Sequence, residues 1–178
     1  MGRARPHGRV EVSMDASDGF LAVLVAERPG LLVGLARRLK SVLWRRYGIR
    51  YRVIHMRELE HPEKGRILRT FIELAGPEEA VSMKCLAIGR GAERLREAAG
   101  AIIRALLARR TILAIYADLE LAPLIARVAP GCPVRPGEPV ELADILAWLN
   151  LAYRRGDPLV RFRRAEDFIR RILKEPRT

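Results

Sequence analysis

The sequence predicts an α+β fold, in which an antiparallel sheet of three to five strands is packed by two main helices. Three observations carry this prediction. Residues 20–26 (FLAVLVA) form a continuous apolar run of strand length, residues 31–47 change to a helical period, and alternating segments then precede a second helical stretch at 92–109. Nearly half of the 178 residues are apolar, so the chain can bury a sizeable core.

The N-terminal part begins with a segment rich in Gly, Pro and Arg. We expect residues 1–19 to be a basic arm, although residues 10–14 (VEVSM) could pair as a short edge strand. The apolar strand 20–26 ends before Pro29-Gly30. In the helix expected at 31–47, one face carries Leu32, Leu35, Leu39, Val42 and Leu43.

Alternation then predicts two strands, at 49–59 and 66–74, joined by turn chemistry at 61–65 (HPEKG). Residues 77–88 fit two interpretations. Pro-Glu-Glu is a good helix start, whereas the alternation of Val81, Met83 and Cys85 with polar residues favours a third strand. We favour the strand, because it completes a hairpin with one buried face.

The C-terminal part is predicted to be mainly helical. After the helix at 92–109 we expect a short strand at 112–116 and a brief helix at about 119–128. The proline-rich stretch 130–139 is the best linker candidate. It would separate a core domain, 20–129, from a helical and basic extension, 140–178, with helices at 140–155 and 163–174.

The charge balance indicates an anionic partner. The formal net charge is +12, and 29 of the 33 cations are arginine. Such an excess attracts polyanions, of which nucleic acid is the usual one. The scarcity of Asn, Gln, Cys and Met suits a thermophilic source. Cys85 and Cys132 have no paired spacing and are expected to be reduced thiols in a cytoplasmic protein without a membrane segment or signal core.

The candidate nucleic-acid contacts are arginines grouped on predicted helix and strand faces. An arginine fork binds phosphate through two hydrogen bonds and also stacks on bases. The first set lies on the helix 31–47, the following strand and the start of the helix 92–109: Arg37, Arg38, Arg45, Arg50, Arg52, Arg90, Arg94 and Arg96. A second basic patch lies near the C-terminus: Arg161, Arg163, Arg164, Arg170 and Arg171. Trp44 and Trp148 are expected in the core or at an interface.

The turn Gly89-Arg90-Gly91 precedes the second helix, and the predicted element order from Leu31 is helix, three strands, helix. This order, with Gly89, Gly91, Arg94, Ala101 and Ala105-Leu106, resembles the double-stranded-RNA-binding domain over residues 31–110. The resemblance implies an αβββα fold and contacts from the second helix to the phosphates of structured RNA.

No catalytic or metal-ligand set is recognisable in the sequence, and no cofactor is expected. His55, Glu58, Glu60 and His61 form the most suggestive cluster, but two histidines six residues apart on one strand could not share a metal. Asp118 and Glu120 follow an apolar strand, a place where some enzymes keep acids, but we favour their interpretation as a pair of acids at a helix N-terminus. We therefore expect a protein that binds structured RNA through phosphates in tRNA or rRNA processing or within a ribonucleoprotein, rather than an enzyme. The alternative is a non-catalytic subunit that binds a protein partner, or a second copy, through residues 140–174.

Overall fold

A five-stranded mixed sheet forms the centre of the molecule, which is described by a computed structural model for residues 8–173. The predicted α+β class is confirmed, but the sheet is not purely antiparallel. Its order is β3-β2-β1-β4-β5. The strands are β1 (Arg9–Ser17), β2 (Phe20–Ala26), β3 (Val81–Ala87), β4 (Thr111–Ala117) and β5 (Val134–Arg135). The first three pair antiparallel, whereas β4 lies parallel to β1 and β5 parallel to β4, because helical crossovers reach β4 and β5.

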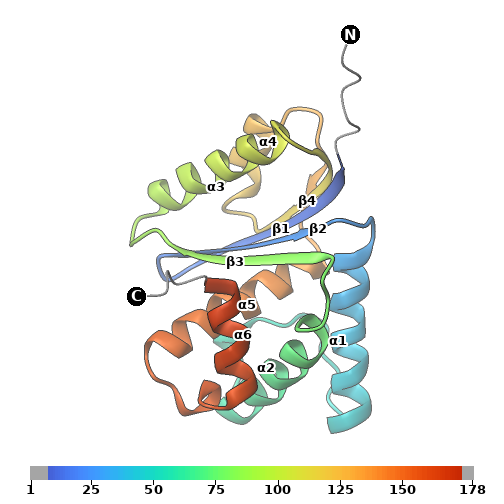
Figure 1. Cartoon of the computed structure of the whole chain (residues 1–178), viewed down its shortest axis with the longest axis vertical. Helices are drawn as coiled ribbons and strands as arrows, with labels where there is room; N and C mark the ends of the chain where they lie inside the picture. Colours follow the sequence, from blue (N-terminus) through green and yellow to red (C-terminus); the bar gives the residue numbers. More distant parts are fainter. Residues whose placement is uncertain (1–7, 174–178) are drawn as a thin grey trace.

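Helices cover both faces of the sheet (Figure 1). One face carries α3 (Ala92–Leu107) and α4 (Ala122–Val128), and the other carries the remaining four α-helices of residues 8–173. Those four are α1 (Leu31–Tyr47), α2 (His61–Ala75), α5 (Glu138–Arg154) and α6 (Arg163–Leu173). Each face therefore has its own apolar core, one built around α1, α2, α5 and α6 and the other around α3 and α4.

Several elements form where their sequence periods predict them. Helix α1 buries Leu32, Leu35, Leu39 and Leu43 along one face and ends at Gly48, whose φ of 70° suits glycine. The strand interpretation of residues 77–88 is also confirmed, since β3 spans Val81–Ala87 and alternates buried with exposed residues. Burial raises the pKa of the Cys85 thiol on this strand to about 12, so the thiol stays protonated and unreactive.

The predicted strands at 49–59 and 66–74 are wrong. Residues 49–55 have no regular structure before the short 3₁₀-helix η1 (Met56–Glu58), and residues 66–74 belong to helix α2. Glu60 and Glu63 form a capping box at the start of α2, and Pro62 occupies its first turn. Ile67, Leu68, Phe71, Ile72 and Ala75 then repeat at helical spacing and are buried. The order from α1 to α3 is thus helix, helix, strand, helix, and differs from αβββα.

The first strand lies in the middle of the sheet, not at its edge. β1 pairs with β2 on one side and with β4 on the other. Val10, Val12 and Met14 face the α3–α4 core, while the alternate residues Glu11 and Ser13 face the opposite layer. Both are satisfied there: Glu11 accepts from the Gly30 amide at 2.9 Å, and Ser13 donates to the Pro139 carbonyl at 2.7 Å.

The stretch 130–139, expected to be a linker, contains β5 and leads into α5. Helix α5 packs beneath the sheet against β1 and β2, and most of its residues are buried. Helix α6 adds Phe168, Ile169 and Ile172 to the same core, and Phe168 meets the ring of Phe71 edge-on at 5.9 Å. Among residues 8–173, no helix combines the length and the apolar character that crossing a bilayer demands.

Candidate functional site

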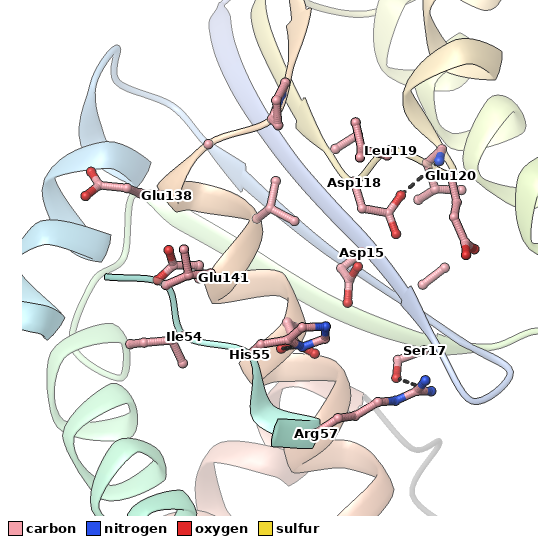
Figure 2. Close-up of a pocket in the computed structure, with 18 of the residues that line it drawn as sticks. Asp15, Ser17, Ile54, His55, Arg57, Asp118, Leu119, Glu120, Glu138 and Glu141 are labelled. Carbon is pink, nitrogen blue, oxygen red and sulfur yellow. Dashed lines mark hydrogen bonds and ion pairs between the residues drawn. The ribbon is translucent and has the colours of Figure 1, made fainter. Parts of the chain in front are cut away.

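The principal pocket opens at the edge of the sheet where the parallel strands β1 and β4 end. Its volume is about 790 Å³. The end of β1, the segment before η1, the first turns of α3, the β4–α4 connection and the first half of α5 all line it (Figure 2). In sheets with parallel strands, ligands bind at the carboxyl ends of the strands, so this is the expected place for a site.

Asp15 and Asp118 bring two carboxyl groups together in this pocket. The β1–β4 register pairs Met14 with Ala117, so the next residues, Asp15 and Asp118, follow on neighbouring parallel strands. Both side chains line the pocket, and Asp15 is only 8% exposed. Burial, with the nearby charges of Asp144 and Asp118, raises the pKa of Asp15 to about 8. At neutral pH the pair therefore holds a proton.

Asp144 and His55 form a second polar pair beside the first. Asp144, on α5, accepts a hydrogen bond from the Met56 amide at 2.8 Å, and its other contact is His55 Nδ1 at 3.2 Å. With Nδ1–H directed at the carboxylate, Nε2 of the imidazole remains available as a proton acceptor. Figure 2 shows the His55 ring pointing toward Asp15. The side chain of His55 is 52% exposed, so a ligand in the pocket can reach it.

A third carboxylate group lies at the other end of the pocket. Glu141 is 8% exposed, and its Oε1 accepts from Lys40 Nζ at 2.8 Å, while its Oε2 has no hydrogen-bond partner. Burial raises the pKa of Glu141, and the Lys40 ammonium opposes that shift. Glu138 at the rim is paired with Arg37, 3.0 Å from Nε to Oε2.

Basic groups face these acids from other elements. Arg52, Arg57 and Arg96 line the pocket, and Arg57 is fixed by Asp18 at 3.0 Å and by the Ser17 hydroxyl at 3.2 Å. The first turn of α3 also borders the pocket and adds the partial positive charge of a helix N-terminus. Within residues 8–173, Arg52 and Arg96 have no ion-pair partner, so both can meet a ligand's negative charge.

The turn Gly89-Arg90-Gly91 shapes this wall. Gly89 and Gly91 have φ of 90° and 135°, conformations that favour glycine. The amides of Ile88 and Gly89 both donate to the Gly19 carbonyl, at 2.9 and 3.1 Å, which joins the start of α3 to the β1–β2 hairpin. The glycines thus allow the backbone before α3 to approach the β1–β2 hairpin closely, and this contact brings the N-terminus of α3 to the pocket.

The pocket is acidic although the protein is basic. Seven of the chain's 21 acidic residues line it, against three arginines. The seven are Asp15, Asp18, Asp118, Glu120, Glu138, Glu141 and Asp144. In the part of the chain that the structure describes, no three acidic, histidine or cysteine side chains form a ready-made metal site. The Asp15–Asp118 pair nevertheless fits Mg²⁺, which commonly uses one or two carboxylates and takes its other ligands from water and substrate phosphates.

The first set of predicted arginines is only partly brought together. Arg52 and Arg96 line the pocket, and Arg37 lies at its rim on Glu138. Arg90 and Arg94 lie in and just after the turn before α3, within two helical turns of Arg96, and both are exposed. Arg38 and Arg45 are exposed on α1, and Arg50 stacks on Trp44 with its guanidinium carbon 4.2 Å from the ring centroid. Trp44 is 43% exposed and lies outside the core, whereas Trp148 is partly buried.

The second basic patch lies away from the pocket. Arg161, Arg163, Arg164, Arg170 and Arg171 are all exposed on or just before α6, and none of them lines the principal pocket. Arg171 packs on Phe168, 5.4 Å from the ring centroid. The apolar side chains of residues 140–172 are largely used inside this chain, which leaves mainly the arginine-bearing face of α6 for a partner.

The suggestive cluster of sequence residues separates in the fold. Only His55 lines the pocket; Glu60 caps α2, and His61 lies 3.6 Å from Asp157. Asp118, which follows the apolar strand, accepts from the Leu121 amide at 2.8 Å before α4 and also lines the pocket. Asp15 and Asp144 belong to no recognisable motif in the sequence. The one signal for Asp15 is a polar residue at every second position of a buried strand, Glu11, Ser13 and Asp15.

No protein-family model, curated protein or solved structure matches this chain. Its class is therefore defined by the fold and the pocket alone: an α+β protein with a mixed sheet and a carboxylate-rich pocket at the strand ends.

Proposed function

We propose that this protein binds nucleic acid, with structured RNA as the expected ligand, and hydrolyses phosphodiester bonds in the acidic pocket with the help of a divalent cation. The observation that carries the proposal is that Asp15 and Asp118, at the ends of neighbouring parallel strands, line one acidic pocket of a strongly basic protein.

Electrostatics support nucleic acid as the ligand. A net charge of +12 attracts a polyanion to the molecule as a whole, and three exposed arginines line the pocket. Inside the pocket, however, the acids outnumber the arginines. A phosphate entering there would be repelled unless cations lay between it and the carboxylates. This requirement favours divalent-cation binding over simple phosphate binding.

Asp15 and Asp118 are the residues that would hold the cation, since they lie at the ends of neighbouring parallel strands and Asp15 carries a proton that a cation can replace. When bound, Mg²⁺ would supply an activated water and would neutralise charge on the phosphate. The cation would have to compete with that proton, so occupancy of the pair should rise with pH.

His55 would accept a proton from the attacking water, with Asp144 fixing the tautomer and orientation of its ring. Arg52 and Arg96, which have no ion-pair partner within residues 8–173, would orient the phosphate together with the N-terminus of α3. These roles assign binding to the basic wall and proton transfer to the His55–Asp144 pair.

Cleavage assays with labelled RNA and DNA, each as single strand, hairpin and duplex, test the proposal. We expect Mg²⁺- or Mn²⁺-dependent cleavage of at least one substrate, lost in Asp118→Asn and reduced about 10²- to 10⁴-fold in His55→Gln. Glu166→Gln on α6, far from the pocket, is the matched control and should cleave normally. Absence of cleavage with every substrate and cation, or full activity of Asp118→Asn, would overturn the proposal.

A further inference from the structure

A row of side chains on α1 leads away from the pocket and ends in two exposed aromatic rings. Arg37, Lys40, Trp44 and Tyr47 follow one another at spacings of three, four and three residues, which places them on one helical face. Within residues 8–173, Trp44 and Tyr47 are the only aromatic members of the exposed large apolar residues. Trp44 is 43% and Tyr47 38% exposed.

The first two members of this row belong to the pocket. Arg37 pairs with Glu138, and Lys40 with Glu141, both of which line the pocket. Lys40 Nζ also donates to the Arg52 carbonyl at 2.9 Å, so the segment that carries Arg52 and Val53 along the pocket is tied to the middle of α1. Trp44 follows Lys40 by one helical turn, about 6 Å along the axis. The aromatic surface is therefore continuous with the pocket.

Guanidinium groups accompany both rings. Arg50 lies over Trp44 at 4.2 Å, and Arg66 lies over Tyr47 at 5.3 Å. Arg45 is exposed beside them, and Arg46 is paired with Glu73. Aromatic rings interleaved with arginines are the chemistry that binds unpaired bases, because a base stacks on either flat group while the charge attracts the phosphates.

We propose that this aromatic–arginine surface, formed by Trp44, Tyr47, Arg50 and Arg66, binds a single-stranded segment of nucleic acid and directs it into the acidic pocket. The inference rests on the proposed function and adds the strandedness of its substrate. From Arg37 to Tyr47 the row spans about 15 Å, enough for about four stacked nucleotides at 3.4 Å each. In a structured RNA, the bound segment would be a loop or a single-stranded end.

Trp44 itself supplies the test. The chain has two tryptophans, so Trp148→Phe leaves Trp44 as the only indole reporter. In that variant, with Asp15→Asn added to prevent hydrolysis, we expect oligo-uridine or oligo-thymidine of about twelve nucleotides to quench the emission. A blunt duplex of the same length should bind more weakly and quench little. The uridine and thymidine arms show whether the segment is RNA or DNA.

Affinity measured by anisotropy with labelled oligonucleotides completes the test. Trp44→Ala should weaken single-strand binding about five- to a hundredfold, and Trp44→Phe should restore most of it. Arg50→Ala removes the stacked guanidinium while leaving the ring in place, and should weaken binding as well. Leu107→Ala is the matched control, because Leu107 is a 36%-exposed apolar residue on α3, across the sheet.

The outcomes separate this inference from the proposed function. Unchanged single-strand affinity in Trp44→Ala would overturn the aromatic–arginine surface, even if the wild-type protein cleaves RNA. Quenching by an acidic peptide but not by oligonucleotides would overturn it in favour of a protein partner. Quenching and loss of affinity as expected, without cleavage under any condition, would uphold the surface and overturn the hydrolytic function.

Discussion

Asp15→Asn should inactivate the protein and at the same time stabilise it. The wild-type carboxyl group has a pKa of about 8 in the folded protein, against an ordinary value of 3.8, because burial and two neighbouring carboxyl groups disfavour its charge. The asparagine amide has nearly the same shape and size as the carboxyl group that it replaces. The amide is uncharged, so burial and the neighbouring carboxyl groups do not destabilise it.

The difference in proton binding between the folded and unfolded states sets the direction in which stability changes with pH. Between pH 4 and pH 8 the folded protein holds the Asp15 proton while the unfolded chain has released it, so stability falls as the pH rises through this range. At pH 7 the difference of about three pH units from the unfolded value corresponds to about 4 kcal/mol. The Asp15→Asn variant escapes this penalty, and a gain of that size raises the melting temperature by about 10 °C in a chain of this length.

Urea unfolding of both proteins from pH 4 to pH 8, in EDTA, measures the effect. The variant should gain stability at pH 7, and the gain should shrink toward zero near pH 4. Ser13→Ala, two residues earlier on the same buried strand face, is the control. It leaves the Pro139 carbonyl without its donor and should lose about 1–3 kcal/mol at every pH. A variant no more stable than wild type at pH 7, or a gain that does not vary with pH, would refute the reasoning.

Three further predictions concern the pocket and the hairpin beside it. Mg²⁺ should raise the melting temperature of the wild-type protein more at pH 8 than at pH 6, because the cation displaces a proton; scanning fluorimetry checks this, and an equal shift at both values would contradict it. Arg52→Ala and Arg96→Ala should each lower the slope of log affinity against log salt by about 0.7 for a single strand, measured by anisotropy; an unchanged slope would remove that residue from the phosphate contacts. Gly19→Ala should lose about 1–2 kcal/mol, since φ is 85° and the new Cβ would lie 3.1 Å from the Gly89 carbonyl carbon, whereas Gly34→Ala on the open face of α1 should be neutral or stabilising in the same urea assay.

The sequence predicts correctly those elements whose spacing of apolar residues fits only a strand or only a helix. The apolar run of β2 and the single apolar face of α1 are of this kind. Residues 66–74 are different, because RILRTFIEL satisfies a two-residue alternation and a helical period at once. The helix forms because the capping box of Glu60 and Glu63 with Pro62 starts it, and because its apolar face packs against α1 and α6.

The site is harder to predict because its residues come together only through long-range pairing. Asp15, Asp118 and Asp144 are separated by about a hundred residues and by a further 26, and they meet only once β4 lies parallel to β1 and α5 crosses beneath them. Charge does indicate an anionic partner. It cannot show that a third of the acids gather in one pocket, since each of them looks locally like a helix cap or a surface residue.

The polar row on β1 shows that the crowding of carboxylates is specific to the pocket. Glu11, Ser13 and Asp15 are all buried on the same strand face. Glu11 accepts a hydrogen bond from the Gly30 amide, and Ser13 donates one to the Pro139 carbonyl. Asp15 instead faces two more carboxyl groups, and only the backbone of Ala16 lowers its pKa. The fold thus gives two of these buried polar residues a hydrogen-bond partner and places the third, Asp15, beside like charges at the mouth of the pocket. Unfavourable electrostatics of this kind concentrate at functional sites.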